Sequence, residues 1–229
     1  MTMIAGNLQD VRARIATACR RAGRNVDDVT LLAVSKTFGP DAVRAAAAAG
    51  QRAFGENYVQ EGLDKIASLR GLGLEWHDIG PIQSNKTRAV AEHFDWVHTV
   101  DRLKIAERLS AQRPEALAPL QVCIQVNIDG GPAKSGVAPA DALALARAVA
   151  ALPRLKLRGL MTIPEPAPDF EAARAVHASA RALFDHLNAE GLGLDTLSMG
   201  MSDDLEAAIA AGSTMVRIGT AIFGSRAPK

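Results

Sequence analysis

The sequence predicts a single (β/α)₈ barrel, the TIM-barrel fold, with one extra helix in front of it. Eight strand-like segments occur along the chain, and each is followed by a helix or a helical turn. Strands that alternate with helices are typically parallel and joined by crossovers. Most of these strands are apolar along their whole length, which is typical of strands covered on both faces. Eight such units match the strand count of a closed barrel.

The predicted strands are short runs of apolar, β-branched or aromatic residues, bounded by glycine, proline or polar residues. In chain order these runs cover residues 29–35, 52–55, 74–79, 96–100, 120–127, 156–161, 196–199 and 214–218. Their lengths are those of ordinary strands, and the spacing between them leaves room for one helix each.

The predicted helices are identified by apolar periodicity and by the residues that begin and end them. Over residues 2–22, apolar residues recur at three- and four-residue steps, and Gly23 ends this first helix. Glycine, proline or aspartate precedes most of the later helices. The helices after the first seven strands end at residues 49, 69, 93, 111, 151, 189 and 211, and a short tail follows the eighth strand.

An open, doubly wound sheet is the alternative architecture. It is less favoured, because no Gly-x-Gly-x-x-Gly follows the first strand and nothing marks a reversal of strand order. The chain contains no linker or low-complexity segment that would divide it. We therefore expect one domain over residues 1–229.

Composition narrows the class of protein. The 229 residues are 48% hydrophobic and 22% charged, and the net charge of +1 offers no basic surface for nucleic acid or an anionic membrane. No apolar run approaches the roughly 18 residues of a membrane span, and the N-terminus does not have the form of a secretion signal. Cys19 and Cys123 lie far apart and form no metal-binding spacing. We expect a cytoplasmic protein without a metal.

Lys36 is the first candidate site residue, because it ends the apolar strand over residues 29–35. In a barrel, functional residues gather at the C-terminal ends of the strands. An ammonium held in such a place loses hydration, which lowers its pKa and makes the neutral amine available as a nucleophile. Lysines of this kind form Schiff bases with carbonyl compounds. Taken alone, Lys36 fits any Schiff-base site, including that of an aldolase.

Two loops add a predicted anion site. Barrels commonly bind phosphate in the loops after strands seven and eight. Ser202 lies in the first of these loops, and Gly219 and Thr220 lie in the second. Ser202 has an alternative interpretation as the N-cap of the helix that follows, with Asp203 and Asp204 in its first turn. In either case we expect the two aspartates to point away from an anion.

Arg217 stands in an otherwise apolar strand, so it needs a buried partner. Either a carboxylate or a ligand would serve. Pyridoxal 5'-phosphate (PLP) offers an aldehyde to a lysine, a phosphate to loops, and a ring nitrogen to an arginine. An arginine does not give up its proton, so the ring would stay unprotonated and be a weak electron sink. Such a site favours Schiff-base exchange over transamination.

Eight segments of the chain carry a family resemblance. They are AVSKT (33–37), FGENY (54–58), WHDIGPIQSNK (76–86), HTVDR (98–102), KSG (134–136), RGLM (158–161), LSMGMSDD (197–204) and VRIGTAIFG (216–224). In this order they resemble the pyridoxal phosphate homeostasis protein family, which shares its fold with the N-terminal barrel of alanine racemase. The resemblance runs nearly end to end.

The resemblance implies one PLP per barrel and assigns positions to it. Lys36 falls on the Schiff-base lysine, Arg217 on the arginine that faces the ring nitrogen, and Asn57 on a residue near the cofactor. The phosphate-binding positions fall on Ser202, Gly219 and Thr220. Met199 and His77 are further candidates for lining the site. Phe38 departs from the family, where many relatives have lysine, and residues 130–133 replace a more polar stretch beside Lys134.

The family is thought to buffer or deliver PLP without an established turnover. We therefore expect a monomeric PLP-binding protein of vitamin B6 homeostasis that is not an enzyme, with apo PLP-dependent enzymes as candidate recipients. The main alternative is a small PLP-dependent amino-acid racemase. It is less favoured, because a two-base racemase needs a second base opposite the lysine, and Tyr58 is the only tyrosine. A metal-dependent or cofactor-free barrel enzyme is the third alternative, and no cluster of ligands or carboxylates supports it.

Overall fold

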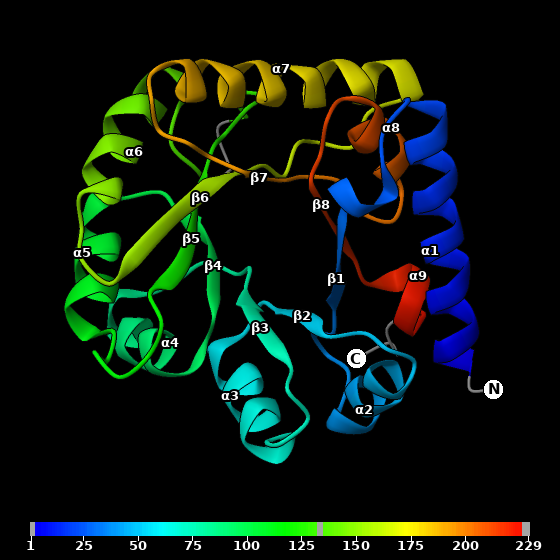
Figure 1. Ribbon diagram of the computed structural model, residues 1–229, viewed down its shortest axis with the longest axis horizontal. Coiled ribbons are helices and arrows are strands. Elements are labelled where there is room, and N and C mark those ends of the chain that lie inside the picture. The colour runs from blue at the N-terminus through cyan, green and yellow to red at the C-terminus, as the bar shows by residue number, and fades with distance from the viewer. Residues whose placement is uncertain (1–2, 132–134, 226–229) are drawn as a thin grey trace.

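The strands close into an eight-stranded parallel barrel, which confirms the predicted fold. The computed structural model describes residues 3–131 and 135–225. Each strand pairs with the next in chain order, and the last pairs with the first (Figure 1). The strands are β1 (Thr30–Val34), β2 (Ala53–Glu56), β3 (Glu75–Asp78), β4 (Trp96–Val100), β5 (Leu120–Gln125), β6 (Leu155–Met161), β7 (Thr196–Ser198) and β8 (Met215–Ile218).

Helices surround the barrel, as Figure 1 shows. They are α1 (Met3–Arg21), α2 (Pro40–Ala48), α3 (Val59–Ser68), α4 (Thr87–His93), α5 (Leu103–Gln112), α6 (Ala142–Ala150), α7 (Phe170–Ala189), α8 (Leu205–Ala210) and α9 (Thr220–Phe223). The predicted extra helix is α1, which precedes β1 and packs beside α8 and α9. The helical turn α9 was not predicted, since four residues are too few to show a helical period.

The barrel has an inner and an outer apolar layer, because successive side chains of a strand point to opposite faces. In β1, Leu32 and Val34 belong to one buried cluster, whereas Ala33 belongs to the other, larger one, which includes buried residues of the surrounding helices. Paired residues of neighbouring strands share a face, so Leu32 and its partner Arg217 both point inward. This alternation decides which residues at the strand ends reach the barrel interior.

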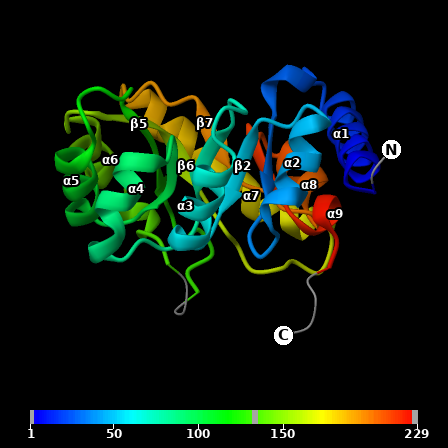
Figure 2. The same cartoon turned by 90° about the horizontal axis from the view of Figure 1, so that it is seen from below.

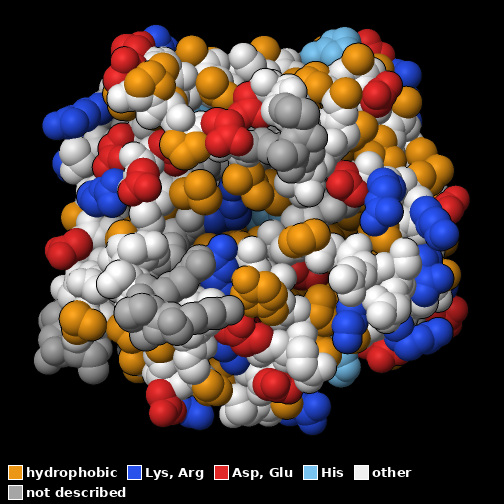
Figure 3. Space-filling view, turned by 180° about the vertical axis from the view of Figure 1, so that it is seen from behind, with side chains coloured by type: hydrophobic (Ala, Val, Ile, Leu, Met, Phe, Trp, Pro, Cys, Tyr) orange, Lys and Arg blue, Asp and Glu red, His pale blue; other side chains and the backbone are white. Residues whose placement is uncertain are grey.

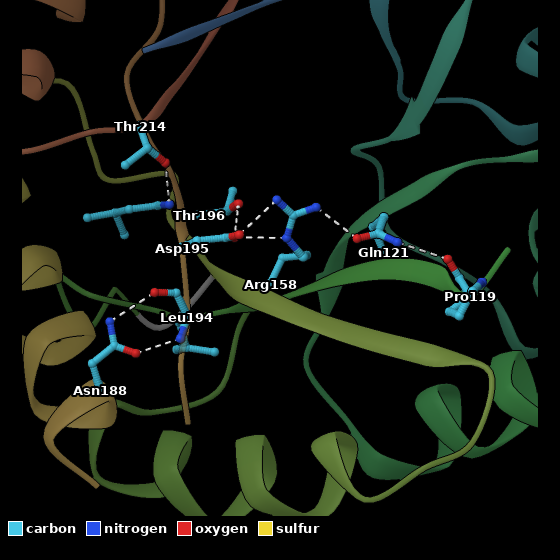
Figure 4. A network of polar contacts seen from close by, with 9 residues as sticks. Pro119, Gln121, Arg158, Asn188, Leu194, Asp195, Thr196 and Thr214 are labelled. Carbon is cyan, nitrogen blue, oxygen red and sulfur yellow. Dashed lines mark hydrogen bonds and ion pairs between the residues drawn. The ribbon is translucent and has the colours of Figure 1, made fainter. Parts of the chain in front are cut away.

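Polar contacts hold the end of the barrel where β5, β6 and β7 begin. The Arg158 guanidinium donates to both carboxylate oxygens of Asp195, at 2.8 and 2.9 Å, and to Gln121 Oε1 at 2.8 Å (Figure 4). The same guanidinium lies 4.6 Å from the centre of the Trp96 ring. Within the described residues, no helix is both long and apolar enough to cross a membrane.

Candidate functional site

A pocket of about 350 Å³ opens at the C-terminal ends of the strands. Six of the eight predicted site residues line it, namely Lys36, Asn57, Ser202, Arg217, Gly219 and Thr220. Figure 2 shows that α9 and the loop from β6 to α7 lie on the same side of the barrel. Figure 3 views this face, which is hollowed near its centre and has Lys or Arg side chains inside the hollow. The structure therefore brings most of the predicted residues together.

Lys36 reaches the pocket because strand alternation continues past the end of β1. Val34 and Lys36 both line the pocket, whereas Ser35 between them is fully buried on the other side. Thr37 follows in the left-handed region, with φ of 69°. A β-branched residue is strained there, and the Thr37 N–H donates to Glu61 Oε1 at 2.6 Å. The turn after Lys36 is thus held by a side chain from α3.

A buried ion pair lies behind the Lys36 backbone. Lys65 Nζ donates to Glu56 Oε1 and to the Ser35 carbonyl, both at 2.7 Å, and it also contacts Glu61 Oε1 at 2.7 Å. The Lys65 and Glu56 side chains are only 3% and 0% exposed, and the Ser35 hydroxyl also donates to Glu56. Burial raises the pKa of Glu56, while the hydrogen bonds from Lys65 and Ser35 counteract that rise. These contacts fix the residues on both sides of Lys36.

Arg217 is buried in the barrel wall and is one of the residues that line the pocket. Its Nη1 donates to Ser198 Oγ at 2.8 Å and its Nη2 to the Thr162 carbonyl at 2.9 Å. Among the described residues it forms no ion pair with a carboxylate, so the carboxylate partner considered from the sequence is not there. Burial lowers the pKa of Arg217 to about 10, and the guanidinium remains charged at neutral pH.

Ser202 is not the N-cap that the alternative interpretation predicts. Helix α8 begins at Leu205, two residues later than the N-cap interpretation requires, and Asp204 occupies its N-cap position. Ser202 Oγ instead accepts a hydrogen bond of 3.4 Å from the N–H of Ala221 in α9. The hydroxyl therefore lies where the loops after β7 and β8 meet.

The two aspartates after Ser202 differ in their position relative to the pocket. Asp204 points away from the pocket, as expected, because its carboxylate accepts from the Met201 N–H at 2.7 Å and contacts His177 Nε2 at 2.8 Å. Asp203 is one of the residues that line the pocket, and the direction of its carboxylate stays a prediction. The sequence could not separate them, since both precede α8 directly.

Close packing leaves little room for a Cβ near both loops. Gly200 has φ of 100°, and a Cβ there would lie 2.6 Å from the Cβ of Ala208. A Cβ on Gly219 would lie 3.2 Å from the carbonyl oxygen of Val34, at the pocket wall. Gly80, which sequence reasoning did not single out, is tighter still, because its Cβ would lie 2.0 Å from the carbonyl oxygen of Asn57. Asn57 is thereby held against the strand-three loop.

His77 and Met199 do not line the pocket. Met199 is fully buried in the outer apolar layer, since it has the opposite strand orientation to Ser198. His77 points inward but lies deeper than Ile79, which does line the pocket. Its ring contacts His98 rather than the pocket.

Phe38 and Tyr58, which the sequence analysis also noted, differ in their relation to the pocket. Phe38 lines the pocket and its ring stacks on Phe223 of α9, with ring centres 5.3 Å apart. Tyr58 is 57% exposed and is not among the lining residues. Lys134 lies outside the described residues.

The chain is similar to known proteins in sequence and in fold. A family model described as alanine racemase, N-terminal domain, matches residues 6–227. The chain is 62% identical over 226 residues to the pyridoxal phosphate homeostasis protein of Pseudomonas aeruginosa, with 99% of this chain and 97% of that protein covered. It is 58% identical over 229 residues to the protein of that name from Escherichia coli K12, with 99% and 98% covered.

Solved structures with a similar fold include a relative and an alanine racemase. The structure of PipY from Synechococcus elongatus with PLP bound is similar with a TM-score of 0.84 and 39% identity, covering 96% of this chain and 100% of that one. Alanine racemase from Corynebacterium glutamicum shares the fold, with a TM-score of 0.68 and 20% identity, covering 96% of this chain and 60% of that one.

Proposed function

The chain belongs to the pyridoxal phosphate homeostasis protein family, and on this premise we propose that it binds PLP through a reversible Schiff base on Lys36. One observation carries the proposal: Lys36 and Arg217 line the same pocket at the C-terminal end of the barrel, and Arg217 has no carboxylate partner among the described residues. The PLP-bound structure of PipY, a relative of 39% identity, supports it.

The residues of the pocket fit this cofactor. Arg217 is a charged donor without a carboxylate among the described residues, which suits a neutral ring nitrogen as acceptor. Ser202, Gly219 and Thr220 come together from two loops, which suits a phosphate. Asn57 Oδ1 is buried and has no hydrogen-bond partner among the described residues, so a ligand would satisfy it.

The side chains around the pocket determine the chemistry. Bound PLP supplies an aldehyde for Schiff-base formation and a ring that can accept electrons. The Lys36 amine would bond the aldehyde carbon with loss of water, and the Glu56–Lys65 pair would hold its backbone. Arg217 keeps its proton, so it would bind the ring nitrogen by donating a hydrogen bond without transferring the proton. These roles favour retention and exchange of the cofactor over carbanion chemistry.

We propose storage, buffering or delivery of PLP in the cytoplasm by a monomeric, single-domain protein, rather than turnover. The relatives are named for homeostasis and not for a reaction. The single tyrosine lies outside the lining residues, so it does not supply the opposite base that a racemase needs. Apo PLP-dependent enzymes are the proposed recipients.

Transfer can be measured by mixing PLP-loaded protein with an apo PLP-dependent enzyme. We expect activation of the apo-enzyme on the scale of minutes or less, and no detectable racemization of alanine by the loaded protein. Adding a phosphatase that destroys free PLP separates direct delivery, which persists, from release into solution, which is lost. Failure to activate at all would rule out delivery, and a racemization turnover of even ~1 per second would favour the racemase.

Replacing Ser202 with alanine tests the phosphate site. Pyridoxine 5'-phosphate is a suitable probe, because it carries the phosphate and no aldehyde. A hydrogen bond to a charged group contributes about 1.5–3 kcal/mol, so we expect Ser202→Ala to raise the dissociation constant roughly tenfold or more. The matched control is Ser179→Ala, on the exposed side of α7. Equal dissociation constants for the two variants in calorimetry would show that Ser202 only links the two loops.

A further inference from the structure

A chain of hydrogen bonds runs through the barrel from the pocket to the opposite mouth. Arg217 Nη1 lies 2.8 Å from Ser198 Oγ, which lies 2.9 Å from His98 Nδ1. His98 Nε2 lies 2.8 Å from His77 Nδ1, and His77 Nε2 lies 2.8 Å from Glu75 Oε1. The two imidazoles are fully buried, whereas the Glu75 side chain is 49% exposed. We call these five side chains the relay.

The relay exists because its members share the inward face of four strands. Glu75 and His77 are two residues apart in β3, so both point inward. The paired partner of His77 is Trp96, which stacks on it with ring centres 5.1 Å apart and places His98 inward as well. Arg217 is paired with the inward Leu32 of β1. Polar side chains buried in this way need hydrogen-bond partners, and these side chains supply them to one another.

Glu75 and Arg217, at the two ends of the relay, determine which atoms of the residues between them carry a hydrogen. The Glu75 carboxylate only accepts, so His77 Nε2 carries a hydrogen. A neutral His77 then accepts at Nδ1, which requires His98 Nε2 to donate. A neutral His98 accepts at Nδ1, which requires the Ser198 hydroxyl to donate to it. Arg217 only donates, and the Ser198 oxygen accepts that hydrogen bond, so all the hydrogen bonds run in one direction.

Both imidazoles are neutral in this scheme, and their surroundings favour that state. Burial lowers the pKa of His77 and lowers that of His98 well below its usual range. The hydrogen bond with His77 lowers the pKa of Glu75, which keeps the carboxylate ionised. Arg158 and Asp95 are the other charged groups close to Glu75 and His77. Arg158 is itself paired with Asp195.

We propose that Glu75, His77, His98 and Ser198 are positioning residues for Arg217, and that the Glu75 carboxylate sets the single proton order that holds the guanidinium in the pocket. The proposal rests on the proposed function insofar as Arg217 binds the cofactor, but the proton order is a property of the protein alone. Glu75 thus acts on the pocket from the far mouth of the barrel.

Nitrogen-15 NMR of histidine-labelled protein without cofactor tests the proton order. At neutral pH we expect both relay histidines as a single Nε2–H tautomer. Glu75→Gln should convert His77 to a mixture of tautomers, because a side-chain amide can accept or donate. Glu115→Gln is the matched control, since Glu115 is also acidic, lies in the loop before β5 and is 90% exposed at its side chain. An Nδ1–H or charged form in the wild type, or an unchanged His77 in Glu75→Gln, would overturn the proposal.

Binding of pyridoxine 5'-phosphate tests the effect on Arg217. We expect Glu75→Gln to raise its dissociation constant roughly threefold to tenfold, the range produced by weakening one hydrogen bond, and Glu115→Gln to leave it unchanged. Equal affinity of Glu75→Gln and the wild type would show that Arg217 needs no relay. If the wild type does not bind the probe, the proposed function fails, while the NMR result still decides the proton order.

Discussion

Replacing Lys36 with alanine should abolish covalent retention of PLP. Lys36 is the one lysine among the described residues that line the pocket, and its neighbours on both sides are held by α3. Without its amine no Schiff base can form there. After incubation with PLP and reduction with borohydride, mass spectrometry should find the adduct on Lys36 in the wild type and none in the pocket of Lys36→Ala. The imine absorbance near the edge of the visible range should disappear with it.

The matched control is Lys104→Ala, which removes an exposed lysine of α5. It should keep the full adduct and the absorbance of the wild type. A wild-type protein that is colourless and gives no adduct on Lys36 would refute the central proposal. Retention of the adduct in Lys36→Ala would place the Schiff base on another lysine.

Replacing Lys65 with alanine should cost much of the stability of the fold. The variant leaves the Glu56 carboxylate buried without its cation, and removes a donor from the Ser35 carbonyl. Breaking a buried ion pair at one partner typically lowers the free energy of unfolding by about 3–5 kcal/mol. Urea denaturation at pH 7.5 measures the difference, with Lys104→Ala again as the control. A loss below about 1 kcal/mol, as for an exposed pair, would show that the network is not needed.

The same variant has a pH dependence of definite sign. Burial raises the pKa of Glu56 in the folded protein, and losing Lys65 would raise it further. A carboxyl with a raised folded pKa is favoured in its protonated form, so its unfavourable contribution is present above that pKa and fades as the pH falls. The stability difference between Lys65→Ala and the wild type should therefore shrink between pH 8 and pH 5. A difference that grows on acidification would contradict the assignment of Glu56 as the uncompensated group.

The barrel was predictable because its signals are local. An apolar run bounded by glycine or proline predicts a strand wherever it occurs, and eight in succession leave few architectures. The strand-end rule then predicted six residues of the pocket, Lys36 and Arg217 among them, because parallel strands bring their carboxyl ends to one side. The same rule misplaced Met199, since it ignores the face to which each residue points. Strand alternation would have corrected that from the sequence.

Other features depend on contacts between distant segments. Ser202 followed by two aspartates is a typical helix start, yet its hydroxyl contacts Ala221 of α9. Lys65 looks like an ordinary helix lysine until α3 packs against β2 and encloses it with Glu56. Neither partner can be identified from spacing along the chain.

Local sequence was enough to predict the order of strands and helices, the family and the position of Lys36 at the pocket, because each depends on residues that are neighbours in the chain. Closure of the barrel decided the rest. It left Arg217 without a carboxylate among the described residues and aligned two histidines between Ser198 and Glu75. Packing of α3 against β2 buried the Glu56–Lys65 pair behind Lys36. Such arrangements arise only when side chains from separate elements are buried together and must satisfy one another there.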